Sequence, residues 1–387
     1  MKKAVTVLAP SFIITYILAV AAGLGQIAQA FPDRSESAVQ LLTSLPSLIA
    51  LPAILLSGHL TAWFRKKQIV LFSLSVMCVA GLCPLLFHGS FYALLIAMAF
   101  TGLGYGGIAP ISSALIAEHY EEDRQPYMLG LQSAVIGIGG ACFSYLGGIL
   151  ARGQWWHVFY VFLLFIPVIA VSFFLPEGEL SGKLGKSGVK DLVNRKLIGI
   201  SCLGVVFCLF FFVFQNNVAT FLDGHGIGDA GLAGTVLSVL SATGIISGLI
   251  CGMIINRFKQ NTFPLLCLAG GIGLLTLYLF PGRGAAFLAA FILGFIFSIR
   301  MPAGYLQASS SVSAPQVTMA ITFFCCVCQI GQFLSPIVNN AITGWLRVSA
   351  DRQFLIGAIA MLIAGMTGMR ASMGEKRIGK TVNEVER

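Results

Sequence analysis

The stretch PEGELSGKLGKSGVKDLVNRK, from Pro176 to Lys196, is the one long hydrophilic connection between apolar segments of this sequence. Six apolar segments precede it and six follow it, each close to the length of about 20 residues that a helix needs to cross a bilayer. Its glycines and charges are typical of a flexible linker. We therefore expect two bundles, over residues 1–175 and 197–373, joined by a cytoplasmic linker at 176–196 and followed by a cytoplasmic tail at 374–387.

The twelve segments predict an all-α integral membrane protein with twelve transmembrane helices in two pseudo-symmetric six-helix bundles. The first segment is too long for the apolar region of a cleaved signal peptide, so we expect it to remain as a span. The expected limits are 5–31, 38–61, 69–87, 91–117, 128–151, 155–175, 197–222, 231–256, 263–280, 285–310, 317–343 and 353–373.

The composition agrees with a membrane protein. Of 387 residues, 57% are hydrophobic and 10% are charged, and the mean hydropathy is +0.88. Soluble domains carry about 25% charged residues. The net charge of +9 comes from basic residues that are mostly scattered between apolar segments. Nucleic-acid binding needs a clustered basic patch instead, so we expect the partners to be a small-molecule substrate and the lipid bilayer, with no nucleic acid.

The basic residues also predict the orientation. If the N-terminus is cytoplasmic, 18 of the 24 lysines and arginines lie in cytoplasmic segments and five in outer segments, and Arg300 is the remaining one. Cytoplasmic loops of membrane proteins carry such an excess of positive charge. We therefore expect a monomeric multi-pass protein of the cell (inner) membrane with both termini in the cytoplasm.

The two halves of the sequence repeat each other. The segment Gly58–Lys67, between the second and third spans, has a counterpart in Gly252–Asn261, which lies 194 residues later between the eighth and ninth spans. Pro110 corresponds likewise to Pro302 at an offset of 192. Parallel six-helix repeats of this kind occur in secondary transporters.

The duplicated segment resembles the G-x-x-x-D-R-x-G-R-R/K signature of the major facilitator superfamily, and the layout of the spans resembles its compact drug-efflux type over the whole chain. In that family the acidic residue of the signature helps to lock the cytoplasmic side. Here Ala62 replaces it, and Trp63 replaces the next, basic residue. We expect Glu118 to form the lock with Arg65 or Lys66. The alternative is that these cations only mark the cytoplasmic face.

Small residues at helical spacing line two spans and would let helices approach closely. They are Ser133, Gly137, Gly140, Ser144 and Gly147 in the fifth span, and Ser241, Gly244, Gly248 and Gly252 in the eighth. The resemblance implies that these stripes form a sliding surface between the bundles. The family's antiporter signature, G-P-x-x-G-G, persists here without its proline and gives slight support to export. The expected gating residues are Gly58, Arg65, Lys66, Glu118, Gly140, Gly147, Gly148, Gly252 and Arg257.

Arg300 is the only formal charge deep inside a predicted span. An arginine there costs about 2.5–3.5 kcal/mol on insertion scales, so it must face a cavity or a partner. Its guanidinium fork suits a carboxylate or phosphate group on a substrate. The alternatives are that it caps carbonyls freed by Pro302 or reaches an interface.

Uncharged polar residues in other spans complete the predicted binding site. Amides donate and accept hydrogen bonds, as a solute site requires, although in lipid they also join helices. With Arg300, the candidates for substrate binding are Gln26, Gln29, Gln132, Gln215, Asn216, Tyr305, Gln307, Gln329, Gln332 and Asn339.

The acidic residues restrict the kind of transport. All fifteen lie in loops, in tails or at span ends. No mid-membrane carboxylate is thus present to attract a cationic drug and carry a proton, which disfavours proton-coupled exporters of cationic drugs. Glu118 and Asp33 are the best remaining proton carriers.

Cofactors and nucleotide-driven pumping are not expected. The pattern G-x-x-x-x-G-K-S/T occurs once, at Gly374–Thr381 in the tail, where it follows a predicted span and not the strand that an ATP-binding loop requires. All ten cysteines lie in apolar segments, where they behave as small hydrophobic residues, so we expect no disulfide and no metal site. A proton or ion gradient would then supply the energy for transport.

These features predict a secondary active transporter, not an enzyme, for a small amphipathic or anionic organic solute. Alternating access in the direction of efflux is the leading hypothesis. An uptake permease for an organic anion is the closest alternative. A membrane sensor or a lipid scramblase is the alternative from another class.

Overall fold

The computed structural model describes residues 2–61, 63–121, 124–177, 194–312, 317–347 and 351–385. Within these residues the regular structure is entirely helical. Eleven stretches are long and apolar enough to span a membrane, and the longest, Ala230–Leu279, contains two helices. The described chain therefore has twelve spans, as the sequence predicts.

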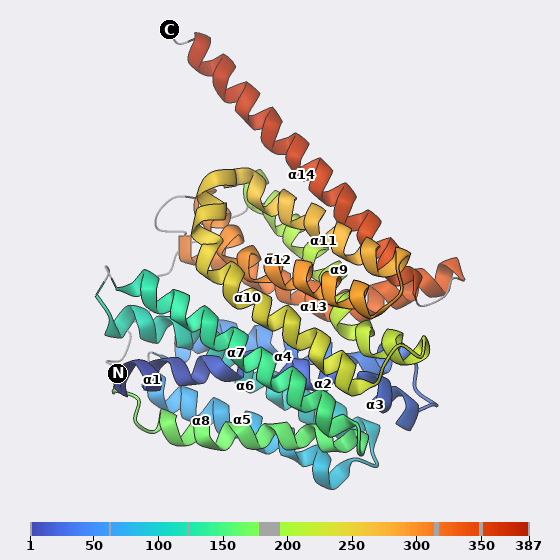
Figure 1. The fold of residues 1–387 in the computed structure, drawn as a ribbon. Helices are drawn as coiled ribbons and strands as arrows, with labels where there is room; N and C mark the ends of the chain where they lie inside the picture. Colours follow the sequence, from blue (N-terminus) through green and yellow to red (C-terminus); the bar gives the residue numbers. More distant parts are fainter. Residues whose placement is uncertain are drawn as a thin grey trace.

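The first six spans come from residues 2–172 (Figure 1). The first span is divided into short pieces. Pro10 lies at the start of a short 3-10 helix, and Gly23 ends the helix Ile17–Ala22. The elements are α1 (Lys2–Leu8), η1 (Ala9–Ile13), α2 (Ile17–Ala22), α3 (Leu24–Ala30), α4 (Glu36–Leu60), α5 (Lys66–Phe87), α6 (Phe91–His119), α7 (Gln125–Ala151), η2 (Trp155–Leu164) and α8 (Phe165–Ser172).

The last six spans begin at Arg195. Their elements are α9 (Arg195–Gly224), α10 (Ala230–Phe258), η4 (Lys259–Asn261), α11 (Thr262–Leu279), α12 (Arg283–Ser309), α13 (Val317–Leu346) and α14 (Arg352–Val385). The last helix continues twelve residues past the predicted end of the span at 373 and projects from the bundle (Figure 1). The predicted tail is thus largely helical, because no proline interrupts it. Residues 178–193 of the predicted linker lie outside the described residues, so the proposed domain limits remain a prediction.

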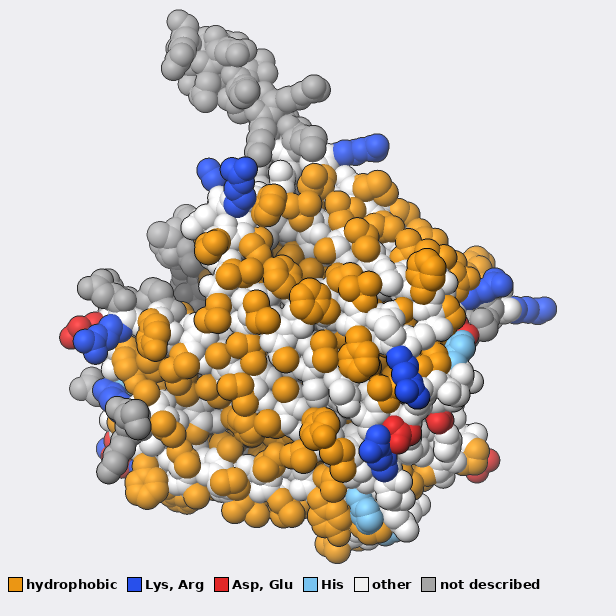
Figure 2. Space-filling model, in the orientation of Figure 1, with side chains coloured by type: hydrophobic (Ala, Val, Ile, Leu, Met, Phe, Trp, Pro, Cys, Tyr) orange, Lys and Arg blue, Asp and Glu red, His pale blue; other side chains and the backbone are white. Residues whose placement is uncertain are grey.

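Each half packs mainly around its own apolar core. One core gathers Tyr16, Phe143, Phe162 and their neighbours, and the other gathers Phe207, Phe211 and theirs. The outer surface is also apolar: in Figure 2 hydrophobic side chains cover the face between two charged margins. This belt is what a hydrocarbon layer requires of the helices that face it. We call the margin where α8 stops and α9 begins the linker end, and the opposite margin the distal end.

The two bundles meet most extensively along α7 and α10, which lie side by side (Figure 1). A Cβ atom on Gly148 would lie 2.5 Å from the Ala230 carbonyl oxygen and 2.8 Å from Gly234 Cα. A Cβ on Gly147 would lie 2.6 Å from Ala19 Cα, and one on Gly140 2.6 Å from Ser241 Oγ. The predicted small-residue stripe therefore makes close helix packing, while its role in gating stays a prediction.

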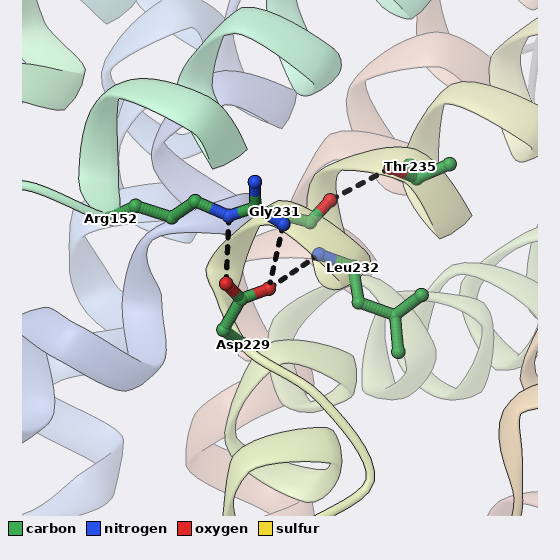
Figure 3. Close-up of polar contacts among 5 residues, drawn as sticks. All are labelled: Arg152, Asp229, Gly231, Leu232 and Thr235. Carbon is green, nitrogen blue, oxygen red and sulfur yellow. Dashed lines mark hydrogen bonds and ion pairs between the residues drawn. The ribbon is translucent and has the colours of Figure 1, made fainter.

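An ion pair joins the same two helices at the distal end (Figure 3). Arg152, which follows α7, contacts both carboxylate oxygens of Asp229, at 2.7 Å from Nε and 3.2 Å from Nη2. Asp229 also caps α10 by accepting from Leu232 N at 3.0 Å. The guanidinium lies against Gly231, where a Cβ atom would be 2.2 Å from it. We call the Arg152–Asp229 pair the distal latch.

Buried amides make a second contact between the bundles, nearer the centre of the distal half. Gln40 of α4 donates to Asn217 of α9 at 2.7 Å and accepts from Asn340 of α13 at 3.0 Å. Thr43, one turn along α4, donates to Asn216 at 2.9 Å. All but Asn340 are at most 6% exposed. These bonds, which we call the amide network, hold the distal half of the interface closed.

Replacing Gly148 with Ala should destabilise the protein by about 1–3 kcal/mol, because the new methyl group meets backbone atoms that cannot move aside. The measurement is the unfolding midpoint of the purified protein in detergent. Gly130→Ala, on the same helix, is the matched control, since nothing lies within 4 Å of its Cβ position. It should be neutral or stabilising by up to about 1 kcal/mol. Equal destabilisation by both variants would contradict the close contact.

The distal latch should weaken only in acid. Burial raises the pKa of the Asp229 carboxyl, but the hydrogen bonds from Arg152 and Leu232 and the Arg152 charge outweigh it and leave the pKa below its usual value. Above the ordinary aspartate pKa of about 3.9, the pair therefore contributes its full stabilisation. This stabilisation is lost as the pH falls through the lowered pKa of Asp229.

Asp229→Asn tests this dependence, because asparagine keeps the helix cap and removes the charge. The side chains of Arg152 and Asp229 are 54% and 52% exposed, so the variant should lose about 0.2–1 kcal/mol of unfolding free energy at neutral pH. The stability difference from wild type should disappear as the solution is acidified. Gly231→Ala should have a similar effect at neutral pH, since it displaces the guanidinium and keeps both charges. A difference that grows in acid would refute the latch.

Candidate functional site

Arg300 lies in the interior, on α12, with 6% of its surface exposed. Its Nη1 donates to Cys208 Sγ at 3.1 Å. Its guanidinium carbon is 4.4 Å from the ring centre of Phe297 and 5.9 Å from that of Phe207. Its Nε has no hydrogen-bond partner. Within the described residues this buried cation thus has thiol and aromatic neighbours and forms no ion pair with a carboxylate.

Residues of both bundles surround Arg300. Tyr105 of α6 and Tyr305 of α12 are close enough to interact electrostatically with its charge. The Tyr305 hydroxyl is 2.9 Å from Cys325 Sγ, which brings α13 to the same place. The sequence reasoning missed Tyr105, because it lies in a glycine-rich stretch that helix packing explains. The repeat offset of 192 identifies it, since that offset matches Tyr105 with Phe297.

The arrangement around Arg300 favours an anion site. Ring contacts contribute about 0.5–2 kcal/mol, less than the cost of about 2.5–3.5 kcal/mol for an arginine inside a span. Among the described residues no carbonyl accepts a hydrogen bond from Arg300, and its burial excludes snorkelling to the surface in this conformation. The free Nε leaves a donor in place for an anionic oxygen. We call Tyr105, Cys208, Phe297, Arg300, Tyr305 and Cys325 the Arg300 cluster.

Several predicted amides lie away from this cluster. Gln215 is buried, its Nε2 has no partner, and it follows Cys208 by seven residues on α9, about 10 Å along the helix axis. Gln26 is half-buried and its Oε1 is likewise without a partner. Asn216 accepts from Thr43 in the amide network. These residues mark a polar layer on the distal side of Arg300.

Two predicted site residues each join helices of their own bundle. Gln132 donates to Ser11 Oγ at 3.0 Å and to Ser112 Oγ at 3.1 Å, so α7 is tied to η1 and α6. Asn339 of α13 donates to the Leu209 carbonyl of α9 at 3.0 Å. Both side chains are at most 5% exposed. These contacts agree with the alternative stated for amides in spans, namely that they join helices.

The remaining predicted residues lie at three different places. Gln29 donates to Asp223 across the bundles at the distal surface. Gln307 lies near the linker end of α12 and donates to the Gln260 carbonyl at 3.3 Å. Gln329 and Gln332 are half-buried, four and seven residues after Cys325, so they share its face of α13.

The linker end carries one predicted charge pair and one that was not predicted, and neither reaches the second bundle. Lys66 contacts Glu118 at 2.5 Å, one of the two pairings expected for that glutamate, and Arg65 pairs with Glu177. Ala62 lies outside the described residues. Gly58 is near the end of α4, and Gly252 and Arg257 lie in the last turns of α10. Whether these residues gate the pathway stays a prediction.

Comparison with known proteins agrees with this architecture. The family model described as "Major Facilitator Superfamily" matches residues 4–336. The uncharacterized MFS-type transporter YybF of Bacillus subtilis (strain 168) is 27% identical over 200 residues, which are 48% of this chain and 47% of that protein. The MFS thioclapurine efflux transporter tcpA of Claviceps purpurea (strain 20.1) is 28% identical over 30% of this chain and 22% of its own. The chain thus spans about half or less of these relatives' length.

A solved structure supports the fold. A crystal structure of a mutant form of the nucleoside transporter NupG superposes with a TM-score of 0.73 at 12% identity, over 95% of this chain and 99% of that one. At this identity the likeness concerns the fold alone. The family match over most of the chain carries the assignment: this protein belongs to the Major Facilitator Superfamily of membrane transporters.

Proposed function

We propose that this protein is a secondary transporter that exports a small organic anion by alternating access, with Arg300 as the anchor of the anionic group. The observation that carries the proposal is the buried guanidinium without a carboxylate partner among the described residues. A bound carboxylate or phosphate would supply the missing charge and accept two parallel hydrogen bonds.

The surroundings of Arg300 support an amphipathic anion. Aromatic rings wall the guanidinium, and the unpartnered Gln215 Nε2 lies about 10 Å further along α9. A solute with its anionic end at Arg300 and an apolar body would meet a hydrogen-bond donor at its far end. The neutral side chains between these two points suit such a body better than a second charge.

The interface between the bundles supports alternating access. The distal latch and the amide network join the bundles in their distal half, whereas at the linker end no described residue lies within 4 Å of the Gly252 or Gly130 Cβ position. With the linker in the cytoplasm, opening of the bundles at the linker end would admit solute from the cytoplasm, as an exporter requires. The efflux function named for the Claviceps relative agrees with this direction. We propose antiport with a proton or ion, by a monomer of the cell membrane with both termini inside.

Transport by the reconstituted protein tests the proposal. Proteoliposomes loaded with radiolabelled benzoate should release it faster than protein-free vesicles, and an imposed pH gradient should accelerate release. Benzamide, the neutral isostere, should leave at the protein-free rate. Uptake against the imposed direction would support the permease alternative, and lipid flip-flop without benzoate flux would support the scramblase. Absence of any protein-dependent anion flux would reject the proposal.

Arg300→Ala should weaken benzoate binding by about 10- to 100-fold, because a hydrogen bond to a charged group contributes about 1.5–3 kcal/mol. Arg300→Lys should lose most of the same affinity, since lysine lacks the planar fork. The measurement is the concentration dependence of benzoate flux. Arg370→Ala is the matched control, because Arg370 is an exposed arginine of α14. Unchanged affinity in Arg300→Ala would remove the argument for an anionic substrate.

A further inference from the structure

A small cavity lies between α10 and α12 at the linker end. Its volume is about 210 Å³, and its polar lining is Asn256, Lys259, Gln260, Gln307 and Ser310. Pockets for drug-sized ligands measure about 300–1,000 Å³, so this cavity suits a small polar group more than a whole amphipathic solute. We call it the Lys259 vestibule.

The vestibule continues the face of α12 that carries Arg300. Ala303 and Gln307, which line the vestibule, follow Arg300 by three and seven residues, the spacing of side chains on one helix face. The distance from Arg300 to Gln307 along the axis is about 10 Å. A solute that leaves the vestibule along this face therefore reaches Arg300 within two helical turns.

Among the described residues that line the vestibule, Lys259 is the only one with a formal charge, and none is acidic. A lysine at this position also complements the negative end of the α10 dipole. That role does not require a cavity, and Arg257 in the last turn of α10 already fulfils it. The vestibule is therefore electropositive, with amide and hydroxyl groups beside the charge.

The backbone of Lys259 is strained. Its φ is +49° and its ψ is −120°, a conformation that glycine adopts readily and L-residues rarely adopt. Glycine at this position would stabilise the fold. The side chain at this strained position is charged and lies beside the cavity, which is consistent with a role for its charge.

The close contacts between α7 and α10 in the described residues end one turn before the vestibule. Ser133 of α7 lies 3.3 Å from the Gly248 Cβ position on α10, but one turn nearer the linker end Gly252 and Gly130 meet nothing within 4 Å. Asn256, Lys259 and Gln260 are exposed. An anion on the linker side can therefore reach Lys259 before it reaches the buried Arg300.

We propose that the Lys259 vestibule is a first, weak docking site for the anionic group of the solute, from which the anion passes along α12 to Arg300. This inference rests on the proposed function, because it concerns the same anion. The chemistry recognised is a single carboxylate or phosphate oxygen group. A lipid headgroup could supply that chemistry as well as a free solute, and the experiment distinguishes these sources.

Thiol labelling tests the vestibule without requiring transport. Gln307→Cys places a thiol in the lining, and Cys202→Ser removes the one exposed native cysteine to lower the background. The probes are the anionic sulfonatoethyl and the cationic trimethylammonioethyl methanethiosulfonates. Adding Lys259→Gln should lower the ratio of anionic to cationic labelling rates by about fivefold at low salt, and the effect should shrink at high salt. Arg257→Gln, the neighbouring charge outside the lining, should change the ratio by less than about twofold.

Benzoate provides the binding readout. It should slow labelling of Gln307→Cys and lose this effect when Lys259→Gln is added. An unchanged rate ratio in Lys259→Gln overturns the proposal, and so does protection by phosphatidylglycerol nanodiscs but not by benzoate, which would assign the site to a lipid headgroup. Arg300→Ala should lower the labelling ratio by less than Lys259→Gln does, because Arg300 is about 10 Å from Gln307, and the difference should disappear at high salt. Failure at Arg300 and failure at the vestibule are thus observed separately.

Lys259→Gly gives an independent measurement. Relief of the backbone strain should raise the apparent unfolding midpoint by about 1–2 °C, while the labelling ratio falls as in Lys259→Gln. A fall in the unfolding midpoint would show that Lys259 is kept for the fold and would overturn the functional role of its charge.

Discussion

Hydrocarbon offers no hydrogen-bond partner, so each polar group in a spanning segment must find one inside the protein. The helices satisfy their own backbone, and polar side chains in the spans bond either to carbonyls of their own helix or across helix contacts. Gln132 bonds to two serines on neighbouring elements, and Asn339 bonds to a carbonyl of α9. Some polar atoms in the spans lack a partner, among them Gln215 Nε2 and Gln26 Oε1, but Arg300 is the case that carries a charge: its Nε has no partner and the bond from its Nη1 goes to a thiol. The candidate site is therefore the place where this constraint is least well met.

The contacts between the bundles are individually weak, and this suits a pathway that must open. Hydrogen bonds between side chains in membrane proteins average about 0.6 kcal/mol, and exposed ion pairs contribute about 0.2–1 kcal/mol. The amide network and the distal latch together hold the distal half closed without making its separation prohibitive. The glycine contacts of α7 and α10 add shape complementarity, and smooth surfaces of this kind can slide without breaking strong bonds.

The charges at the linker end are distributed differently. Lys66 pairs with Glu118 of its own bundle, and Arg65 pairs with Glu177 in the segment after α8. These pairs fasten α5 to α6 and to that segment without reaching the second bundle. Lys259, on the second bundle, lines a cavity instead of pairing with an acidic residue of that lining. The linker end thus combines two ion pairs on α5 with the vestibule that Lys259 lines on the second bundle, and Arg300 adds a positive charge nearer the centre.

The sequence by itself determined the twelve spans, their limits to within a few residues in most cases, and the six-plus-six repeat, because the apolar length needed to cross a bilayer is a local property of the chain. It also identified Arg300, since a charge inside an apolar segment stands out locally, and it named Lys66 as a partner for Glu118. Only the tertiary structure decided which polar residues face one another. Gln40 and Asn340 are 300 residues apart, Arg152 and Asp229 are 77 apart, and no local pattern links them. A glutamine on an apolar helix has the same pattern whether it joins helices, as Gln132 does, or keeps a free donor, as Gln215 does. That difference depends on how each helix is rotated and packed against its neighbours, which is a property of the folded chain.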